Sequence, residues 1–350
     1  MAGARSRSIA WLVDPALQGG TSAAVAAELQ ALDGWPAQRR VHEMRTRMGG
    51  GRPPAPVLAD ALDRLGLPLR PARGTVAADV VILHNPALLK FEATLPFRVV
   101  ARDLFVVLHE NPTRPGGAEG FDLDHALTLL ERFSFTGRRW LAPISARNRA
   151  SLGAAPPGWR VTAEDWFNIC DFPLLPASAR PADRRGRHSR PGPEKFPSLA
   201  TLDRLFPPTA GANVLLGADP LLKAAEERQH WQVHPFRGLP LERYFQMIDF
   251  QVHFTAPTWA ESFGRALAEG IAAGKVVISD PETAAGFGGG VIGARPEEVD
   301  AVIAAHVADP ARYAAQVARG QQALRGFSAG AFRDRFARLC DPRPGLERAA

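Results

Sequence analysis

The sequence predicts an α/β protein built from two doubly wound domains with parallel sheets, and three observations favour that class. Short apolar runs of strand length alternate with longer stretches of helical periodicity, which is the pattern of βαβ units. The first apolar run is followed by a glycine turn and a helix, as in the opening unit of such a sheet. With 350 residues, the chain is long enough for two domains that each bury a core.

Composition narrows the classes of function. The formal net charge is +6, but no basic run with interleaved aromatic residues occurs, so nucleic-acid binding is not predicted. Anionic small ligands or an acidic membrane surface account for the charge more simply. The two cysteines have no metal-like spacing and make no disulfide framework. No apolar run suits a membrane span or an export signal, so we expect a cytoplasmic protein, with at most peripheral contact at the inner membrane face.

The first half contains strands and helices in the order that a doubly wound domain requires. It has neither a GxGxxG motif nor a P-loop lysine, so a standard dinucleotide or nucleoside-triphosphate loop is not predicted. The pair Gly19-Gly20 lies where a ligand-binding loop would begin, although a plain tight turn is the simpler alternative. The predicted strands are 8–13, 80–83, 99–100 continuing at 104–108, and 140–145, and the predicted helices are 23–32, 57–65, 127–133 and 147–152.

Two histidines follow predicted strands of this half directly. His84 comes after the strand at 80–83, and His109 comes after the strand that ends at residue 108. Open α/β sheets place ligand-contacting residues at the carboxyl ends of their strands. A lone histidine is more often structural, and for His84 we favour that interpretation.

In the second half, residues 257–279 carry the clearest chemical pattern. Small and apolar residues recur at helical spacing over 266–274, and the run 276–278 is typical of a buried parallel strand. Ser262 is a plausible N-cap, and the unpaired amides that follow it suit a phosphate group at the positive end of the helix. Gly264 keeps side-chain bulk away from that position.

Two glutamates flank this helix start. Glu261 and Glu269 suit the hydroxyls of a sugar or ribose better than they suit phosphate. From the physics alone, a routine serine cap and a solvated helix glutamate are an equally good interpretation. The remaining elements of this half alternate in the same way, with strands at 213–218, 231–234 and 250–254 and helices at 241–248, 297–306, 312–324 and 331–339.

The motif from Glu261 through Ser262, Phe263 and Gly264 to Glu269 resembles the Glu-x7-Glu signature of retaining glycosyltransferases of the GT-B fold. That family, the group 1 glycosyl transferases, contains glycogen synthases, sucrose synthases and bacterial mannosyltransferases.

Two further stretches carry the resemblance. Residues 186–195 resemble the family's Gly-Arg…Lys element, whose arginine and lysine hold the donor diphosphate. Residues 168–171 resemble the element that opens the second domain, with Ile169 in place of the usual glycine.

The resemblance implies roles for individual residues. Lys195 would hold the diphosphate together with Arg187, which follows the glycine as in the family, or with Arg190, which keeps the Arg-x4-Lys spacing. Glu269 would bind the ribose and Glu261 the donor sugar. The implied donor-binding residues are Gly19, Gly20, Arg187, Arg190, Lys195, Gly238, Glu261, Ser262, Phe263, Gly264 and Glu269, and the implied catalytic residues are His109, Glu261 and Lys195. With the resemblance, a functional role is favoured for His109, which would lie beside the transferred sugar.

We therefore expect a GT-B architecture of two Rossmann-like domains facing a central cleft. Residues 1–160 would form the acceptor side and 161–335 the nucleotide-sugar side, with 336–350 as a tail that packs back or is disordered. The expected reaction transfers a hexosyl group from a nucleotide-diphosphate sugar to a hydroxyl acceptor with retention, without a metal or bound cofactor. The expected acceptor is a carbohydrate or lipid-linked, in polysaccharide or glycolipid synthesis. The alternative is a catalytically silent GT-B subunit that binds a nucleotide sugar or a partner enzyme.

Overall fold

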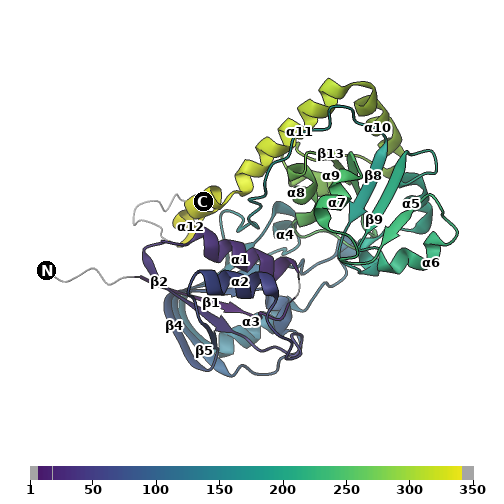
Figure 1. Cartoon of the computed structure of the whole chain (residues 1–350). Helices are drawn as coiled ribbons and strands as arrows, with labels where there is room; N and C mark the ends of the chain where they lie inside the picture. Colours follow the sequence, from purple (N-terminus) through teal and green to yellow (C-terminus); the bar gives the residue numbers. More distant parts are fainter. Residues whose placement is uncertain (1–6, 18, 341–350) are drawn as a thin grey trace. The chain divides into compact units, whose positions relative to one another are not determined.

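The computed structural model describes residues 7–17 and 19–340, which form two α/β units (Figure 1). The first unit combines the chain up to Ile169 with the segment from Ala329, and the second runs from Cys170 to Ser328. The sequence pattern placed these divisions at 160 and 335. Residues 341–350, which include most of the expected tail, lie outside the described residues.

The first unit contains a seven-stranded sheet in the order β3-β2-β1-β4-β5-β6-β7, with every neighbouring pair parallel. Its inner strand β1 is apolar because both faces are covered: residues 9–13 are at most 3% exposed. Three strands were not expected from the sequence. β2 has a single buried residue, Val41, and β3 and β7 are too short to show a pattern. The strands are β1 Arg7–Val13, β2 Ala37–Glu43, β3 Leu69–Pro71, β4 Gly74–His84, β5 Phe97–Leu108, β6 Ser134–Pro143 and β7 Arg160–Val161.

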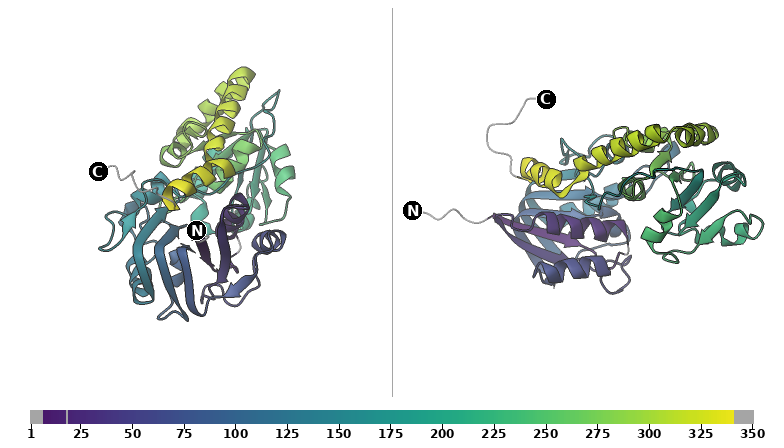
Figure 2. Two further views of the ribbon diagram at one scale, coloured as in Figure 1. Left: turned by 90° about the vertical axis from the view of Figure 1, so that its left-hand side faces the viewer. Right: turned by 45° about the horizontal axis from the view of Figure 1, so that its top comes forward.

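Helices cover this sheet, and one of them comes from the far end of the chain. The final helix α12 packs beside α1, which also contacts α2 (Figure 2). Phe332 and Phe336 of α12 lie edge-on to the indole of Trp166, each with ring centroids 5.8 Å apart. The helices are α1 Gly20–Ala31, α2 Pro56–Arg64, α3 Leu123–Arg132, α4 Ala146–Ala150 and α12 Ala329–Cys340, with 3₁₀ turns η1 Pro86–Leu89 and η2 Pro115–Gly117.

The second unit contains a six-stranded parallel sheet in the order β10-β9-β8-β11-β12-β13. The strands are β8 Arg184–His188, β9 Ala212–Leu216, β10 Gln232–His234, β11 Phe250–His253, β12 Val276–Ser279 and β13 Ile292–Gly293. The helices are α5 Leu199–Leu205, α6 Leu222–Ala225, α7 Leu241–Gln246, α8 Arg265–Ala272, α9 Pro281–Ala285, α10 Val299–Ala308 and α11 Pro310–Leu324, with 3₁₀ turns η3 Pro193–Lys195, η4 Asp219–Leu221, η5 Pro296–Glu298 and η6 Arg325–Phe327.

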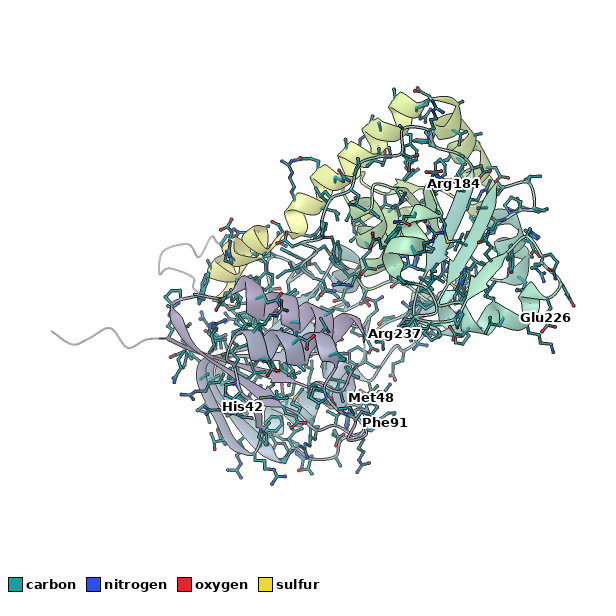
Figure 3. All side chains as sticks on the ribbon, viewed as in Figure 1. His42, Met48, Phe91, Arg184, Glu226 and Arg237 are labelled. Atoms are coloured by element: carbon teal, nitrogen blue, oxygen red, sulfur yellow. The ribbon has the colours of Figure 1, made fainter. Side chains whose placement is uncertain are left out.

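Strand β8 was not among the strands predicted from the sequence, because most of its residues are basic. It is an inner strand of the sheet, and its charges are compensated locally. Arg184, labelled in Figure 3, forms two hydrogen bonds of 2.7 and 3.0 Å with the fully buried carboxylate of Asp249. Arg185 is paired with Asp183 at 2.7 Å and donates to the carbonyl of Leu205. A strand with this composition is stable only because each buried cation has such partners.

Each sheet has one topological switch point, where the strand order reverses. In the first sheet it lies between β1 and β4, and in the second between β8 and β11. Loops that leave such neighbouring strands diverge, and the space beyond their carboxyl ends is where doubly wound sheets bind ligands. None of the helices within residues 7–17 and 19–340 has the length and apolar character needed to cross a membrane.

Candidate functional site

The switch point of the second sheet collects the predicted donor-site residues. Strand β8 leads into the loop that ends at Lys195, and β11 leads into the loop that carries Glu261. Helix α8, which carries Glu269, follows that second loop. Residues from three parts of the sequence therefore lie at the carboxyl ends of two adjacent strands.

Lys195 and Glu261 form a nearly buried ion pair. The ammonium nitrogen lies 2.9 Å from both carboxylate oxygens, and the two side chains are only 10% and 14% exposed. The Nε2 atom of His253 lies 3.2 Å from Oε1 of the same carboxylate. The ammonium nitrogen also lies 5.0 Å from the ring centroid of Trp259, within cation–π distance.

This environment shifts two pKa values in a consistent direction. Burial alone would raise the pKa of Glu261, but the charge of Lys195 and the contact with His253 outweigh it, so the pKa lies below its usual range. Burial, and then the charge of Arg187, lower the pKa of His253 to about 4. At neutral pH Glu261 is therefore a carboxylate, and His253 is a neutral ring that donates its Nε2 proton to it.

The two candidate arginines occupy different environments. Arg187 is 1% exposed, and its terminal nitrogens donate to the backbone carbonyls of Phe254 and Lys195. It ties the two loops together. The side chain of Arg190 is 55% exposed, forms an ion pair of 2.9 Å with Glu194 and lies over the ring of Trp259.

Glu269 is held in place by a histidine and an arginine. Its Oε2 atom lies 2.9 Å from Nε2 of His188, the last residue of β8, and its Oε1 atom accepts from Nε of Arg265 at 3.0 Å. Burial would raise the pKa of Glu269, but His188 and Arg265 together lower it. The carboxylate is therefore ionised and fixed in orientation on the first turns of α8.

The predicted N-cap at Ser262 is wrong. Helix α8 begins at Arg265, and its N-cap is Gly264, which has φ of 92° and makes no side-chain capping bond. Phe263 packs edge-on against Phe287 and Phe327, with ring centroids 6.0 and 5.3 Å away. The chain needs glycine immediately after this anchored ring, because other residues rarely adopt such a positive φ.

Gly238 lies apart from these residues. It forms part of the turn after β10, where its amide donates to Pro235 and the neighbouring Arg237 (Figure 3) has φ of 61°. Strand β10 is the edge strand, separated from β8 by β9. The structure therefore places Gly238 at the same end of the sheet but not beside Lys195 and Glu261.

In the first unit, the two predicted histidines contact one another. The Nδ1 atom of His84 lies 2.9 Å from Nε2 of His109. His84 is 1% exposed, and its Nε2 atom lies 3.5 Å from Oε2 of the buried Glu28. Burial first, and the neighbouring His84 second, hold the pKa of His109 well below its usual value.

The Gly19-Gly20 loop follows β1 beside these histidines in the strand order. Gly19 is the N-cap of α1 with φ of 130°, a conformation that side-chain-bearing residues rarely adopt, and Gly20 begins the helix. A Cβ atom at either position would meet no atom within 4 Å. No hydrogen bond joins these glycines to the histidines among the described residues.

Asn148 fixes the backbone that follows His109. It is fully buried, and its amide nitrogen donates to the carbonyl of Glu110 and to Oδ1 of Asn111, both at 3.0 Å. Its own Oδ1 atom accepts from the amide of Ile144 at 3.1 Å. The loop after β5 is thereby anchored to the start of α4.

Sequence reasoning missed four residues that shape the site. His188 ends β8, which was not predicted as a strand, and His253 ends β11, which was predicted to extend to residue 254. The rule that selected His109 would have found both histidines had these two strand ends been recognised. Glu28 is the only charged residue of α1, which is the signal that its carboxylate has a partner. Nothing in the pattern around Asn148 distinguishes it.

Neither a protein-family model nor a curated protein sequence matches this chain. Solved structures match it along almost its full length. Alr3699/HepE from Anabaena, solved with UDP and glucose and also with UDP-glucose, superposes with a TM-score of 0.65 in the first of these complexes. Identity in that comparison is 15%, and the match covers 95% of this chain and 98% of the other.

Two further solved structures have the same fold as this chain. A glycosyltransferase from Rickettsia africae has a TM-score of 0.62 at 11% identity, covering 97% of this chain and 100% of its own. The apo structure of OtsA has a TM-score of 0.56 at 14% identity, with the same coverage of 97% and 100%. At these identities the likeness establishes the fold, and the predicted GT-B class of two parallel-sheet units is confirmed.

Proposed function

We propose that this chain is a glycosyltransferase that moves a sugar from a nucleotide-diphosphate donor to a hydroxyl acceptor with retention and without a metal. The observation that supports it most is the group of charges at the β8/β11 switch point. Lys195 and Arg190 offer cations for a diphosphate, while Glu261 and Glu269 offer fixed carboxylates for hydroxyls. A sugar nucleotide carries both kinds of group, whereas a simple phosphate ligand would not use the carboxylates.

Lys195 can serve the donor without releasing Glu261. An ammonium group has three N–H donors, and the single carboxylate of Glu261 uses at most two of them. The remaining donor would bind a phosphate oxygen and stabilise the negative charge as the nucleotide diphosphate leaves. The ionised Glu261 would stay available to accept from hydroxyls of the sugar.

Of the two arginines, Arg190 is the better candidate for the diphosphate. The terminal nitrogens of Arg187 already donate to backbone carbonyls, and its burial lowers its pKa to about 10. Arg190 is more than half exposed and would exchange Glu194 for a phosphate. Arg187 would then act by holding the carbonyls of Lys195 and Phe254, which fixes the two loops.

The nucleotide can be identified by thermal stabilisation with UDP, GDP, ADP and TDP. UDP is the first candidate because Alr3699/HepE binds UDP-glucose. A ligand at about 100 times its Kd should stabilise the protein by about 2.7 kcal/mol. Lys195→Ala should abolish the shift, while Lys223→Ala, on α6 of the same unit, should retain it.

Activity then follows from transfer of labelled sugar and from the anomeric configuration of the product. Retention of configuration supports the proposal, and inversion contradicts it. If no diphosphate stabilises the protein, the proposal fails. If one binds but no sugar is transferred to any acceptor, the silent-subunit alternative takes its place.

The acceptor we propose is a carbohydrate or a lipid-linked sugar, in polysaccharide or glycolipid synthesis. The net charge of +6 agrees with an acceptor at an anionic membrane surface. Salt-sensitive co-sedimentation with vesicles that contain anionic lipid is the expected result. Absence from such vesicles at every salt concentration would remove the membrane part of the proposal.

A further inference from the structure

Glu28 is a buried carboxylate whose two oxygens both act as hydrogen-bond acceptors. It is 3% exposed, and Oε1 accepts from the indole of Trp11 at 2.6 Å. Oε2 accepts from the indole of Trp166 at 2.8 Å. The next polar group is Nε2 of His84, which lies 3.5 Å from Oε2, within ion-pair distance. No other partner of this nitrogen is present among the described residues.

This arrangement gives the contacts from Glu28 through His84 to His109 a direction, and we refer to them as the Glu28–His84–His109 relay. Because Glu28 accepts and does not donate, Nε2 of His84 must carry the hydrogen that faces it. When His84 is neutral, its Nδ1 is an acceptor, and the hydrogen in the 2.9 Å contact comes from Nε2 of His109. A protonated His84 would donate from Nδ1 and reverse this direction.

His109 is consequently left with one unprotonated nitrogen. Its side chain is partly exposed at the carboxyl end of β5, and the described residues provide no hydrogen bond to its Nδ1 atom. Burial and the neighbouring His84 lower its pKa, so the ring stays neutral at physiological pH. A neutral imidazole with a free Nδ1 accepts a hydrogen bond and does not attract anions.

We propose that His84 is neutral and that Glu28 and His84 are positioning residues that hold His109 as its Nε2–H tautomer, so that Nδ1 accepts a hydrogen bond from a substrate hydroxyl. The part about the substrate rests on the proposed function. A hydroxyl is the class that fits, because ionised phosphates and carboxylates offer only acceptors to this nitrogen. A donor with a carboxylate at this position, such as a uronic-acid sugar, is predicted to be excluded.

The tautomer can be measured directly in the full-length protein without any substrate. Imidazole ¹⁵N resonances distinguish protonated from unprotonated ring nitrogens, and His84→Gln and His109→Gln assign the two rings. We expect a protonated Nε2 and an unprotonated Nδ1 on His109. A proton on Nδ1 of His109 in the wild-type protein, or an even mixture of both tautomers, would overturn the inference.

Glu28→Leu tests the origin of the direction. Leucine offers no acceptor to Nε2 of His84, so the tautomer of His84 is no longer fixed and His109 should show a mixture of both tautomers. The matched control is Glu131→Leu, because Glu131 of the same unit also accepts an indole hydrogen bond, from Trp159 at 2.7 Å, and lies outside the relay. The control should leave the His109 spectrum unchanged.

An unchanged His109 spectrum in folded Glu28→Leu would contradict the role of Glu28. If that variant does not fold, the wild-type spectrum alone decides. Failure of every nucleotide diphosphate to bind would overturn the proposed function but not the tautomer. The wrong tautomer in an active transferase would overturn only this inference.

Discussion

At the scale of single residues, Glu261 is the carboxylate whose state depends most on its neighbours. Lys195 supplies its nearest cation, and both side chains are almost completely buried. Removing one partner of such a pair leaves the other charge uncompensated, which costs more than the pair itself contributes. Stability should therefore respond to substitutions at these two positions in a strongly non-additive way.

We predict that Lys195→Met destabilises the protein by roughly 2–4 kcal/mol. Adding Glu261→Gln should recover most of the loss, because the orphaned charge is removed. Chemical denaturation of the two single variants and the double variant measures the coupling, expected to exceed about 1 kcal/mol. Simple additivity of the two substitutions would show that the pair has little effect on stability.

The lowered pKa of His253 predicts how the free energy of unfolding depends on pH. Its folded pKa of about 4 lies below the unfolded value of about 6.5. Between these values the unfolded chain binds a proton that the folded protein does not, so stability falls as the pH is lowered from 6.5 to 4. The maximal slope is about 1.4 kcal/mol per pH unit. The charged groups that face this ring are Arg187, Lys195 and Glu261.

His253→Gln should remove this slope while keeping an N–H donor for Glu261. Denaturation of the variant and the wild-type protein at pH 6.5, 5.5 and 4.5 gives the comparison. His42 and His109 also have lowered pKa values and stay in both proteins, so the difference between the two curves isolates His253. Parallel curves would contradict the assignment.

At the scale of elements, β8 is stabilised by polar partners where its neighbours are stabilised by apolar burial. Arg184 and Asp249 join β8 to the start of β11, and Gly186 keeps the strand close to α7. A Cβ atom at position 186 would lie 2.6 Å from Ile248 and 2.8 Å from the hydroxyl of Tyr244. The small residue and the paired arginine are both needed at these positions.

Asp249→Asn should destabilise the second unit by roughly 1–3 kcal/mol, less than the loss expected for Lys195→Met, because Arg184 still reaches water. Glu298→Gln, which disrupts the exposed pair with Arg295, is the control and should have no measurable effect. Denaturant midpoints compare the two variants. Equal midpoints for Asp249→Asn and Glu298→Gln would show that water replaces the Asp249 carboxylate as the partner of Arg184 at no cost in stability.

Helices and strands could be predicted from the sequence where their hydrophobic pattern was strong. They were missed where a buried strand carries charged residues that are paired with other residues of the fold. Strand β12 and helix α8 follow simple periodicity and were found. Strand β8 was missed because alternation rules count arginine as exposed. The cap at Ser262 was misplaced because the packing of Phe263, a tertiary contact, decides where α8 begins.

The candidate site shows the same division. Lys195, Glu261 and Glu269 were predicted from motif resemblance, and the structure places all three beyond the carboxyl ends of strands β8 and β11. Their roles stay predictions. Glu28 could not be paired with His84 from sequence, because that contact depends on how α1 packs against the ends of two strands. Local patterns identify residue types at strand ends, but only the packed fold shows which atoms face one another.

At the scale of the whole molecule, the first unit depends on a helix from the end of the chain. Phe336→Ala removes a 1% exposed ring from α12 and should destabilise that unit by about 3–5 kcal/mol. Hydrogen exchange should accelerate in β1 and β4 but not in β11 and β12. Phe135→Ala, at a 65% exposed position of the same unit, is the control and should change neither. Uniform acceleration in both units would contradict separate stabilisation.

The placement of α12 also has a consequence for synthesis on the ribosome. Residues 170–328 are contiguous, so this unit can fold as soon as it emerges. The unit translated first must wait for Ala329–Cys340, and until then Trp166, which packs against Phe105, lacks the aromatic cover that α12 provides. The half that is made first is therefore completed last. A nascent chain stalled before α12 would expose an aggregation-prone aromatic surface that chaperones would have to cover.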